Sequence, residues 1–197
     1  MAGYIGSKAV LLSTTAAEVS GDADIGGSVL VDTIKSDNGT TALTIDSSGR
    51  VLTPVRPAFS LFYDSSGAEG VGNGNTVVFT GVHSNIGSHY NTSTGIFTAV
   101  VSGFYQFNLV AFGSNSSGGA VAANSSSSVA LYDNTNSADL ARAYAYTQTG
   151  SFHPNLSFSS AHYLSASTEV KILPGSGAYL YSDSSDKYCK FSGFLIG

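Results

Sequence analysis

The chain has four histidines among many serines, and these residue types are the ones that nucleophilic catalysis uses. The histidines are His83, His89, His153 and His162. A serine hydrolase needs a serine, a histidine and a carboxylate within mutual reach, beside an oxyanion hole. The sequence has no Gly-x-Ser-x-Gly nucleophile elbow, and in so serine-rich a chain some serine lies near a histidine by chance. We therefore predict that the protein is not an enzyme and assign no catalytic residue.

Acidic residues in loops are the candidates for glycosidase chemistry and for binding a cation. Two loops carry a pair each, Asp64 with Glu69 and Asp183 with Asp186. Glycosidases place two carboxylates on either side of the scissile bond, and calcium prefers oxygen ligands. We expect all four acids to be solvated loop residues. The prediction is no metal and no cofactor, with calcium at Asp183 and Asp186 as the alternative.

Paired tyrosines favour recognition over catalysis. Tyr144 and Tyr146 share one face of an expected strand, and Tyr179 and Tyr181 share a face of another. Tyrosine together with serine, glycine and asparagine makes an adaptable binding surface, and aromatic rings also stack on sugars. These four tyrosines are the possible ligand surface. The alternative is that they fill the protein core or an oligomer axis.

Composition limits the elements that can position these residues. The chain has 197 residues and net charge −5, and only 11% of its residues are charged, against about 25% in an average domain. Without a basic cluster we expect no nucleic-acid partner. No apolar run approaches the ~20 residues of a membrane span, and Val10–Leu12 is too short for a signal-peptide core. One cysteine, Cys189, excludes an intrachain disulfide. An all-β protein that associates with other subunits fits these limits.

The distribution of aromatic residues divides the chain into residues 1–53 and 54–197. The second part holds all 11 Phe and ten of the 11 Tyr, and Pro54 and Pro57 mark an extended connector. In the first part, strand patterns at 29–34, 42–46 and 50–52 alternate with turn signals at 37–39 and 47–49. This thin β-meander is marginal alone. We expect it to form an anchor and stem that winds with copies from other chains.

The second part alternates strand signals with turn clusters. Its expected strands are 58–63, 76–82, 95–101, 104–112, 128–132, 141–147, 156–164, 169–173, 178–181 and 188–196. Tyr105, Phe107, Leu109 and Ala111 alternate with polar residues and should face one interior. Residues 113–127 are of low complexity and are expected to form a loop. Many short strands separated by Gly/Ser/Asn turns indicate a sandwich or jelly roll.

Three blocks of this part resemble one known family. Residues 57–60 read PAFS, residues 85–107 read NIGSHYNTSTGIFTAVVSGFYQF, and residues 191–196 read FSGFLI. They are similar to the globular head of the C1q/tumour-necrosis-factor superfamily, with its P-A-F start, its N-x-G-x-x-Y-x-x-x-T-G-x-F and G-x-Y-x-F core, and its F-S-G-F-L end. The resemblance spans residues 56–197. In three places the chain departs: a valine replaces the usual proline after Gly-x-Phe, Ser167–Val170 replaces G-D-x-V, and residues 1–53 stand where a collagen stalk is usual.

The resemblance implies a ten-stranded jelly roll that assembles as a tight homotrimer. It assigns the head core and trimer contacts to Phe59, Tyr90, Phe97, Gly103, Tyr105, Phe107, Phe191, Gly193 and Phe194. We expect Gly95 and Gly103 to occupy turns with positive φ, and Gly193 to permit a close backbone approach. Phe191 and Phe194 should both close the sandwich from the last strand.

The N-terminal segment carries a second resemblance. Residues 1–7 (MAGYIGS) and 20–27 (SGDADIGG) are similar to the starts of virion proteins from marine tailed bacteriophages, which makes Tyr4 and Ile5 the candidate particle anchor. The function this implies is a trimeric short fibre, spike or knob on the phage virion, made in the host cytoplasm and used for host-surface attachment. Its partners would be itself, other virion proteins, and a host glycan or protein, without membrane insertion. The alternatives are a capsid decoration protein and a secreted C1q-like recognition ligand.

Overall fold

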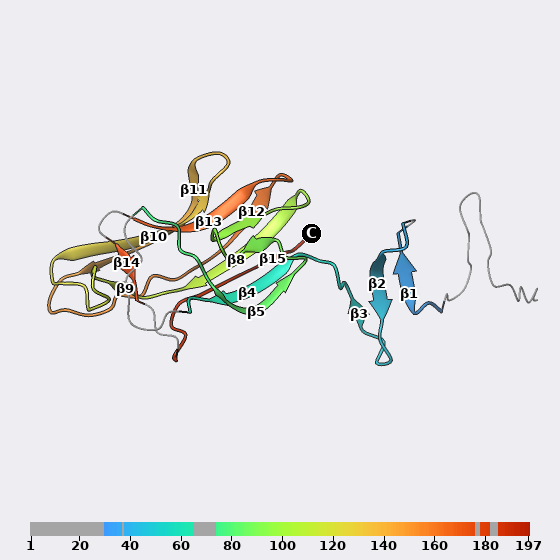
Figure 1. The fold of residues 1–197 in the computed structure, drawn as a ribbon, viewed down its shortest axis with the longest axis horizontal. Coiled ribbons are helices and arrows are strands. Elements are labelled where there is room, and N and C mark those ends of the chain that lie inside the picture. Colours follow the sequence, from blue (N-terminus) through green and yellow to red (C-terminus); the bar gives the residue numbers. More distant parts are fainter. Residues whose placement is uncertain (1–29, 37, 65–73, 176–177, 182–184) are drawn as a thin grey trace, which may run out of the picture. The chain divides into compact units, whose positions relative to one another are not determined.

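Every regular element in the part of the chain that the structure describes is a β-strand (Figure 1). The structure is a computed structural model that describes residues 30–36, 38–64, 74–175, 178–181 and 185–197. The candidate anchor residues Tyr4 and Ile5 lie outside the described residues, as do Asp183 and Glu69. The all-β prediction is confirmed.

The first three strands form a small antiparallel sheet of their own. They are β1 (Thr33–Lys35), β2 (Thr41–Ile45) and β3 (Val51–Leu52), in the order β1-β2-β3. Both predicted turns are present, because Gly39 and Gly49 adopt φ of 84° and 76°, a region that favours glycine. Asp46 closes the second turn by accepting the backbone N–H of Ser48 at 2.9 Å and pairing with Nε of Arg50 at 2.7 Å. These bonds, those of Arg50 above all, lower the pKa of Asp46. The boundary at residue 53 stays a prediction.

The remaining strands build a jelly-roll sandwich of two five-stranded antiparallel sheets. One sheet has the order β11-β10-β13-β7-β6, with β6 (Tyr90–Asn91), β7 (Ile96–Thr98), β10 (Ser125–Asp133), β11 (Ala138–Thr147) and β13 (Glu169–Pro174). The other has the order β12-β8-β15-β4-β5, with β4 (Ala58–Phe62), β5 (Gly81–Ile86), β8 (Gly103–Val110), β12 (Phe158–Leu164) and β15 (Lys190–Leu195). A separate two-stranded antiparallel sheet consists of β9 (Gly113–Ser114) and β14 (Tyr179–Leu180).

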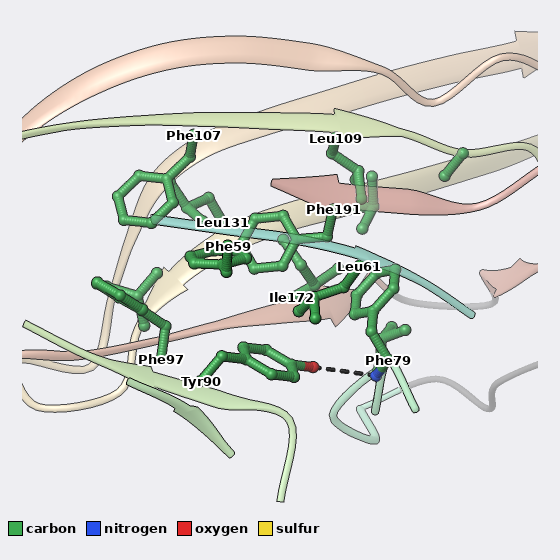
Figure 2. Packing of buried hydrophobic residues seen from close by; sticks show 14 of the residues in the cluster. Phe59, Leu61, Phe79, Tyr90, Phe97, Phe107, Leu109, Leu131, Ile172 and Phe191 are labelled. Atoms are coloured by element: carbon green, nitrogen blue, oxygen red, sulfur yellow. Dashed lines mark hydrogen bonds between the residues drawn. The ribbon is translucent and has the colours of Figure 1, made fainter. Parts of the chain in front are cut away.

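Aromatic rings fill the space between the two sheets (Figure 2). Six of the seven aromatic residues that the resemblance assigned are at most 4% exposed: Phe59, Tyr90, Phe97, Tyr105, Phe107 and Phe191. The ring of Phe59 lies at the centre, with centroids 5.0 Å from Phe191 and 5.2 Å from Phe97. Each such pair contributes about 0.5–1.5 kcal/mol beyond its burial. The alternation along β8 places Tyr105, Phe107 and Leu109 in this core, as predicted.

The Asn85–Gly95 segment owes its pattern to the turn that joins the two sheets. The Asn85 side chain donates from Nδ2 to the carbonyl of Tyr90 at 2.8 Å, and the Tyr90 hydroxyl accepts the backbone N–H of Phe79 at 3.0 Å (Figure 2). Burial raises the pKa of Tyr90. Gly95 adopts φ of 75°, as expected, and a Cβ there would lie 2.6 Å from the carbonyl oxygen of Val77. The sequence pattern of Asn85–Gly95 is thus explained by the hydrogen bonds and the close contact that form this turn.

Two expectations about assigned residues, Phe194 on β15 and Gly103 on β8, are wrong. Phe194 is 44% exposed and does not close the sandwich with Phe191, because residues three apart on a strand point to opposite faces. Gly103 is not among the described glycines that have a positive φ. Its glycine is needed for space, since a Cβ would lie 2.9 Å from the carbonyl oxygen of Gly197. At Gly193 the close neighbours are rings rather than backbone, with Phe59 and Phe107 atoms 2.8 Å from a Cβ.

Two strand boundaries also differ from the prediction. Residues 76–80 of the expected strand at 76–82 belong to no strand, and the strand β5 lies later, at Gly81–Ile86. The expected loop at 113–127 contains β9, and the serine run belongs to β10, where Ser127 and Ser128 are buried against β11. Serine is compatible with both a strand and a loop, and backbone pairing with β11 makes this segment a strand.

Candidate functional site

The outer face of the sheet β12-β8-β15-β4-β5 exposes large apolar side chains. Phe104, Tyr163 and Phe194 are 53%, 58% and 44% exposed, and Ile86 and Val110 are also exposed. Strand register aligns them: Phe104 is opposite Tyr163, with ring centroids 5.5 Å apart, and Phe194 and Ile86 both flank Ala58. These five residues are called the apolar face below. Phe104, Tyr163, Phe194 and Ile86 lie toward one end of the strands, and Val110 lies toward the other end, opposite Lys190. Exposed apolar side chains that gather on one face often mark an interaction site.

A row of small polar residues crosses the same face. One residue from each strand stands opposite the next, in the order Ser159, Asn108, Ser192, Ser60 and Ser84. The hydroxyl of Ser159 donates to Oδ1 of Asn108 at 2.8 Å, and Gln106 donates from Nε2 to Ser159 at 2.9 Å. The face therefore combines exposed apolar side chains with a line of hydrogen-bonding groups.

The outer face of the other sheet has a different character. Tyr144 and Tyr146 are exposed on β11, and their neighbours are polar: Arg142 donates to Ser128 at 3.0 Å, and Lys171 lies 5.4 Å from the ring centroid of Tyr132. Charged and hydroxyl groups keep this face hydrated. Tyr144 and Tyr146 are thus exposed on a polar face, and their assignment to a ligand surface stays a prediction.

An aromatic pocket next to the pair β9-β14 is built from distant parts of the chain. The pocket has a volume of about 260 Å³ and is lined by Phe112, His153, Tyr181 and Tyr188. Backbone bonds hold its walls: the N–H of Tyr181 donates to the carbonyl of Phe112 at 2.7 Å, and that of Gly113 to the carbonyl of Pro154 at 2.7 Å. A Cβ at Gly113 would lie 2.8 Å from Cγ of Pro154, so glycine allows this approach.

The rings of the pocket contact one another in sequence. The His153 imidazole lies 4.4 Å from the ring centroid of Tyr181, Tyr181 lies 5.5 Å from Tyr188, and Tyr188 lies 5.9 Å from Phe112. Nδ1 of His153 is 2.9 Å from the carbonyl oxygen of Gly113. Of the predicted ligand tyrosines, only Tyr181 belongs to this pocket. Tyr179 pairs with Ser114 in β14, which ends at Leu180.

Comparison with known proteins decides the family. The family model described as "C1q domain" matches residues 58–196. The chain belongs to the C1q domain family. Among solved structures, the globular domain of the zebrafish complement 1qA protein aligns with a TM-score of 0.55 and 22% identity, covering 72% of this chain and 98% of that one. The Eiger TNF of S. frugiperda also gives a TM-score of 0.55, at 14% identity, covering 72% of this chain and 94% of that one. A search of curated proteins finds no match.

The other candidate chemistry does not come together in this C1q domain. His83 stacks on Phe62 at 4.8 Å, His162 lies on β12, and His153 is in the pocket. Within the described ranges, no group of three or more His, Cys, Asp or Glu side chains could hold a metal. Asp186 is described and Asp183 is not, so the alternative of a calcium site at this pair stays a prediction. In the described part of the chain, no helix is both long and apolar enough to span a membrane.

Sequence reasoning missed two surfaces and had only weak signals for them. Phe104 and Tyr163 alternate with the core residues of β8 and β12, so the sequence pattern could have predicted that both face outward. The pocket was not, because Phe112, His153 and Tyr188 come from separate segments with no common spacing.

Proposed function

We propose that this C1q domain protein assembles as a homotrimer through its apolar face. The exposure of Phe104, Tyr163 and Phe194 on one sheet face carries the proposal. Burial of apolar surface contributes roughly 25 cal/mol per Å², and only 11% of the residues are charged, so little repulsion opposes association. The occupant is a second and a third copy of this chain, in the trimer that the C1q/tumour-necrosis-factor resemblance implies.

The polar row supports a single arrangement of the three copies. A buried face with only apolar groups tolerates several registers, whereas groups that must find hydrogen-bond partners select one. Asn108 and Ser192 stand side by side in the middle of the row, at the centre of the sheet. Buried against another copy, they would need partners there. The row therefore favours an association with one fixed register.

The trimer's role, on this proposal, is that of a recognition head on a phage virion. Residues 1–53 would join other virion proteins, and the C1q-like head would project as a short fibre, spike or knob that attaches the particle to a host surface. Support comes from the phage-like N-terminal segments and from exposed aromatic residues such as Tyr144 and Tyr146. Three heads in one trimer multiply a weak contact through avidity. Recognition, and not catalysis, is the proposed activity.

Two alternatives share the C1q domain. In a capsid decoration protein the head would clamp shell subunits and would not touch the host. In a secreted recognition ligand the head would act away from any particle, which is compatible with the C1q family.

The mass of the purified full chain in solution tests the assembly. Light scattering should give three times the 20.1 kDa of one chain. A mass of 20.1 kDa that persists over a hundredfold range of concentration would refute the trimer. A dimer would refute it equally, because the proposed contact joins three copies.

Binding to cells and copy number separate the three roles. A virion attachment protein should bind host cells as purified chain and should reduce infection when it is added before the phage. Hundreds of copies per particle without cell binding would support capsid decoration. Absence from purified particles would support the secreted ligand.

A further inference from the structure

We propose that the pocket of Phe112, His153, Tyr181 and Tyr188 binds a neutral pyranose unit of a glycan. This inference rests on the proposed recognition function and gives that function a ligand class and a site. It assigns the contact to one tyrosine of the predicted ligand surface, Tyr181, together with three residues that no sequence pattern indicated. Four observations support it: the ring geometry, the orientation of the histidine, the absence of fixed charge, and the rigidity of the frame.

The rings form an open cradle. The planes of Tyr181 and Tyr188 meet at 41°, and those of His153 and Tyr181 at 47°. Neighbouring rings are in contact, with centroids 4.4 to 5.9 Å apart, so no ligand fits between them. Their tilted planes instead make a concave aromatic surface, on which one face of a pyranose chair can lie with its axial C–H groups against the electron-rich face of a ring. The volume of about 260 Å³ lies below the ~300–1,000 Å³ of pockets for drug-sized ligands and suits one sugar unit.

The imidazole of His153 has a defined orientation. Its Nδ1 lies 2.9 Å from the carbonyl oxygen of Gly113. A carbonyl oxygen can only accept a hydrogen bond, so Nδ1 carries the proton and donates it. In the neutral imidazole, Nε2 is then the acceptor. An acceptor beside aromatic rings suits a ligand that offers hydroxyl groups as donors, and a pyranose unit carries several.

The lining and the frame complete the case for a neutral, ordered ligand. The described lining residues, Phe, His and two Tyr, carry no fixed charge, so among them there is neither a cation for a carboxylate nor an anion for an amine. The frame is fixed by the bridge between Phe112 and Asn155 and by the Tyr181–Phe112 backbone bond. A site that is already in its bound form loses little entropy when the ligand enters. None of the four lining residues lies on a strand that carries the apolar face.

Titration of the full chain with methyl glycosides of neutral hexoses and N-acetylhexosamines tests the proposal. Binding is followed by saturation-transfer NMR and by the shift of the His153 ring resonances in the unmodified protein. At least one glycoside should bind saturably at millimolar concentration. Tyr181→Ala should weaken it by about tenfold or more, whereas Tyr181→Phe keeps the stacking face and should stay within about threefold. His153→Asn can still donate to Gly113 but lacks the Nε2 acceptor, so it should also lose binding. His153→Gln, which can place an acceptor near Nε2, should lose less.

The outcomes distinguish this inference from the proposed function. If no glycoside binds, or if Tyr144→Ala removes binding that Tyr181→Ala leaves intact, the pocket is not the sugar site. If the same preparations still bind cells, and Tyr181→Ala and His153→Asn do not change that binding, the attachment role would hold and would use another contact surface. A loss of cell binding in parallel with the loss of glycoside binding supports both. The ring shifts need no variant, so a variant that fails to fold does not remove the test.

Discussion

The rings of Phe104 and Tyr163 face each other across β8 and β12 on the outside of the sandwich, with centroids 5.5 Å apart and planes at 73°. Edge-to-face packing of this kind is usual inside a core, yet both rings are more than half exposed in the single chain. The pair is therefore the part of the apolar face from which assembly can gain most.

Phe104→Glu should dissociate the trimer. The carboxylate is well solvated on a single chain, but in the assembly an unpaired charge would be buried in each copy, at a cost of several kcal/mol apiece. Light scattering should report 20.1 kDa for the variant with an unchanged far-UV spectrum. The matched control is Tyr144→Glu, an exposed tyrosine of the opposite sheet, which should keep the mass of the unmodified protein. If only the control, Tyr144→Glu, dissociates the trimer, the copies associate through the opposite sheet, and the proposed interface is wrong.

The sequence predicted the core better than the surfaces because core positions repeat with a fixed period. Tyr105, Phe107 and Leu109 alternate with polar residues on one strand, so their common direction follows from strand geometry. The same period would have placed Phe191 and Phe194 on opposite faces, and the expectation failed where a motif was read as a unit. The edge strand β5 has two large apolar residues, Val82 and Ile86, and both are exposed, so it gave no alternating core pattern. The serine run of β10 is indistinguishable from a loop by composition.

The pocket shows a different limit of sequence reading. Tyr181 was expected to act with Tyr179 because the two are two residues apart, but the strand ends at Leu180. Its actual ring neighbours, His153 and Tyr188, are set by the β9-β14 pairing and by the Tyr181–Phe112 backbone bond. Such long-range pairing has no local signature in one sequence.

Tyr90→Phe should destabilise the domain by about 1–3 kcal/mol. The substitution keeps the ring and removes the oxygen that accepts the N–H of Phe79, which leaves a buried donor without its partner. Chemical denaturation at a fixed protein concentration should show a lower midpoint with an unchanged slope. Tyr144→Phe removes an exposed hydroxyl and should change stability by less than about 0.5 kcal/mol. Equal effects of the two substitutions would contradict the role of the buried bond.

Cys189 should be inert in the folded protein. The residue is 1% exposed, and burial raises the pKa of its thiol to about 12. At pH 8 only about one thiol in ten thousand would ionise, and the thiolate is the reactive form. A disulfide-exchange reagent such as dithionitrobenzoate should therefore label the native chain at the rate of its unfolding and label the denatured chain at once. Rapid stoichiometric labelling of folded protein would show that this part of the core opens easily.

His162 should make the domain less stable in mild acid. It lies on the inward side of β12, its buried Nε2 has no hydrogen-bond partner within the described structure, and desolvation lowers the pKa of its imidazole. Because the folded pKa lies below the unfolded value of about 6.5, the unfolded chain binds the proton first. Stability is then complete above pH 6.5 and declines as the pH falls through the folded pKa.

Denaturation midpoints between pH 7.5 and 5.0 measure this dependence, above the range in which most carboxylates titrate. His162→Leu replaces the imidazole with an apolar side chain and removes the titrating group. The dependence of its denaturation midpoint on pH should therefore be flatter than that of the unmodified protein. If both profiles fall equally, the acid sensitivity arises at another group. If stability rises on acidification, the imidazole is charged in the fold, which would contradict its desolvated position between the sheets.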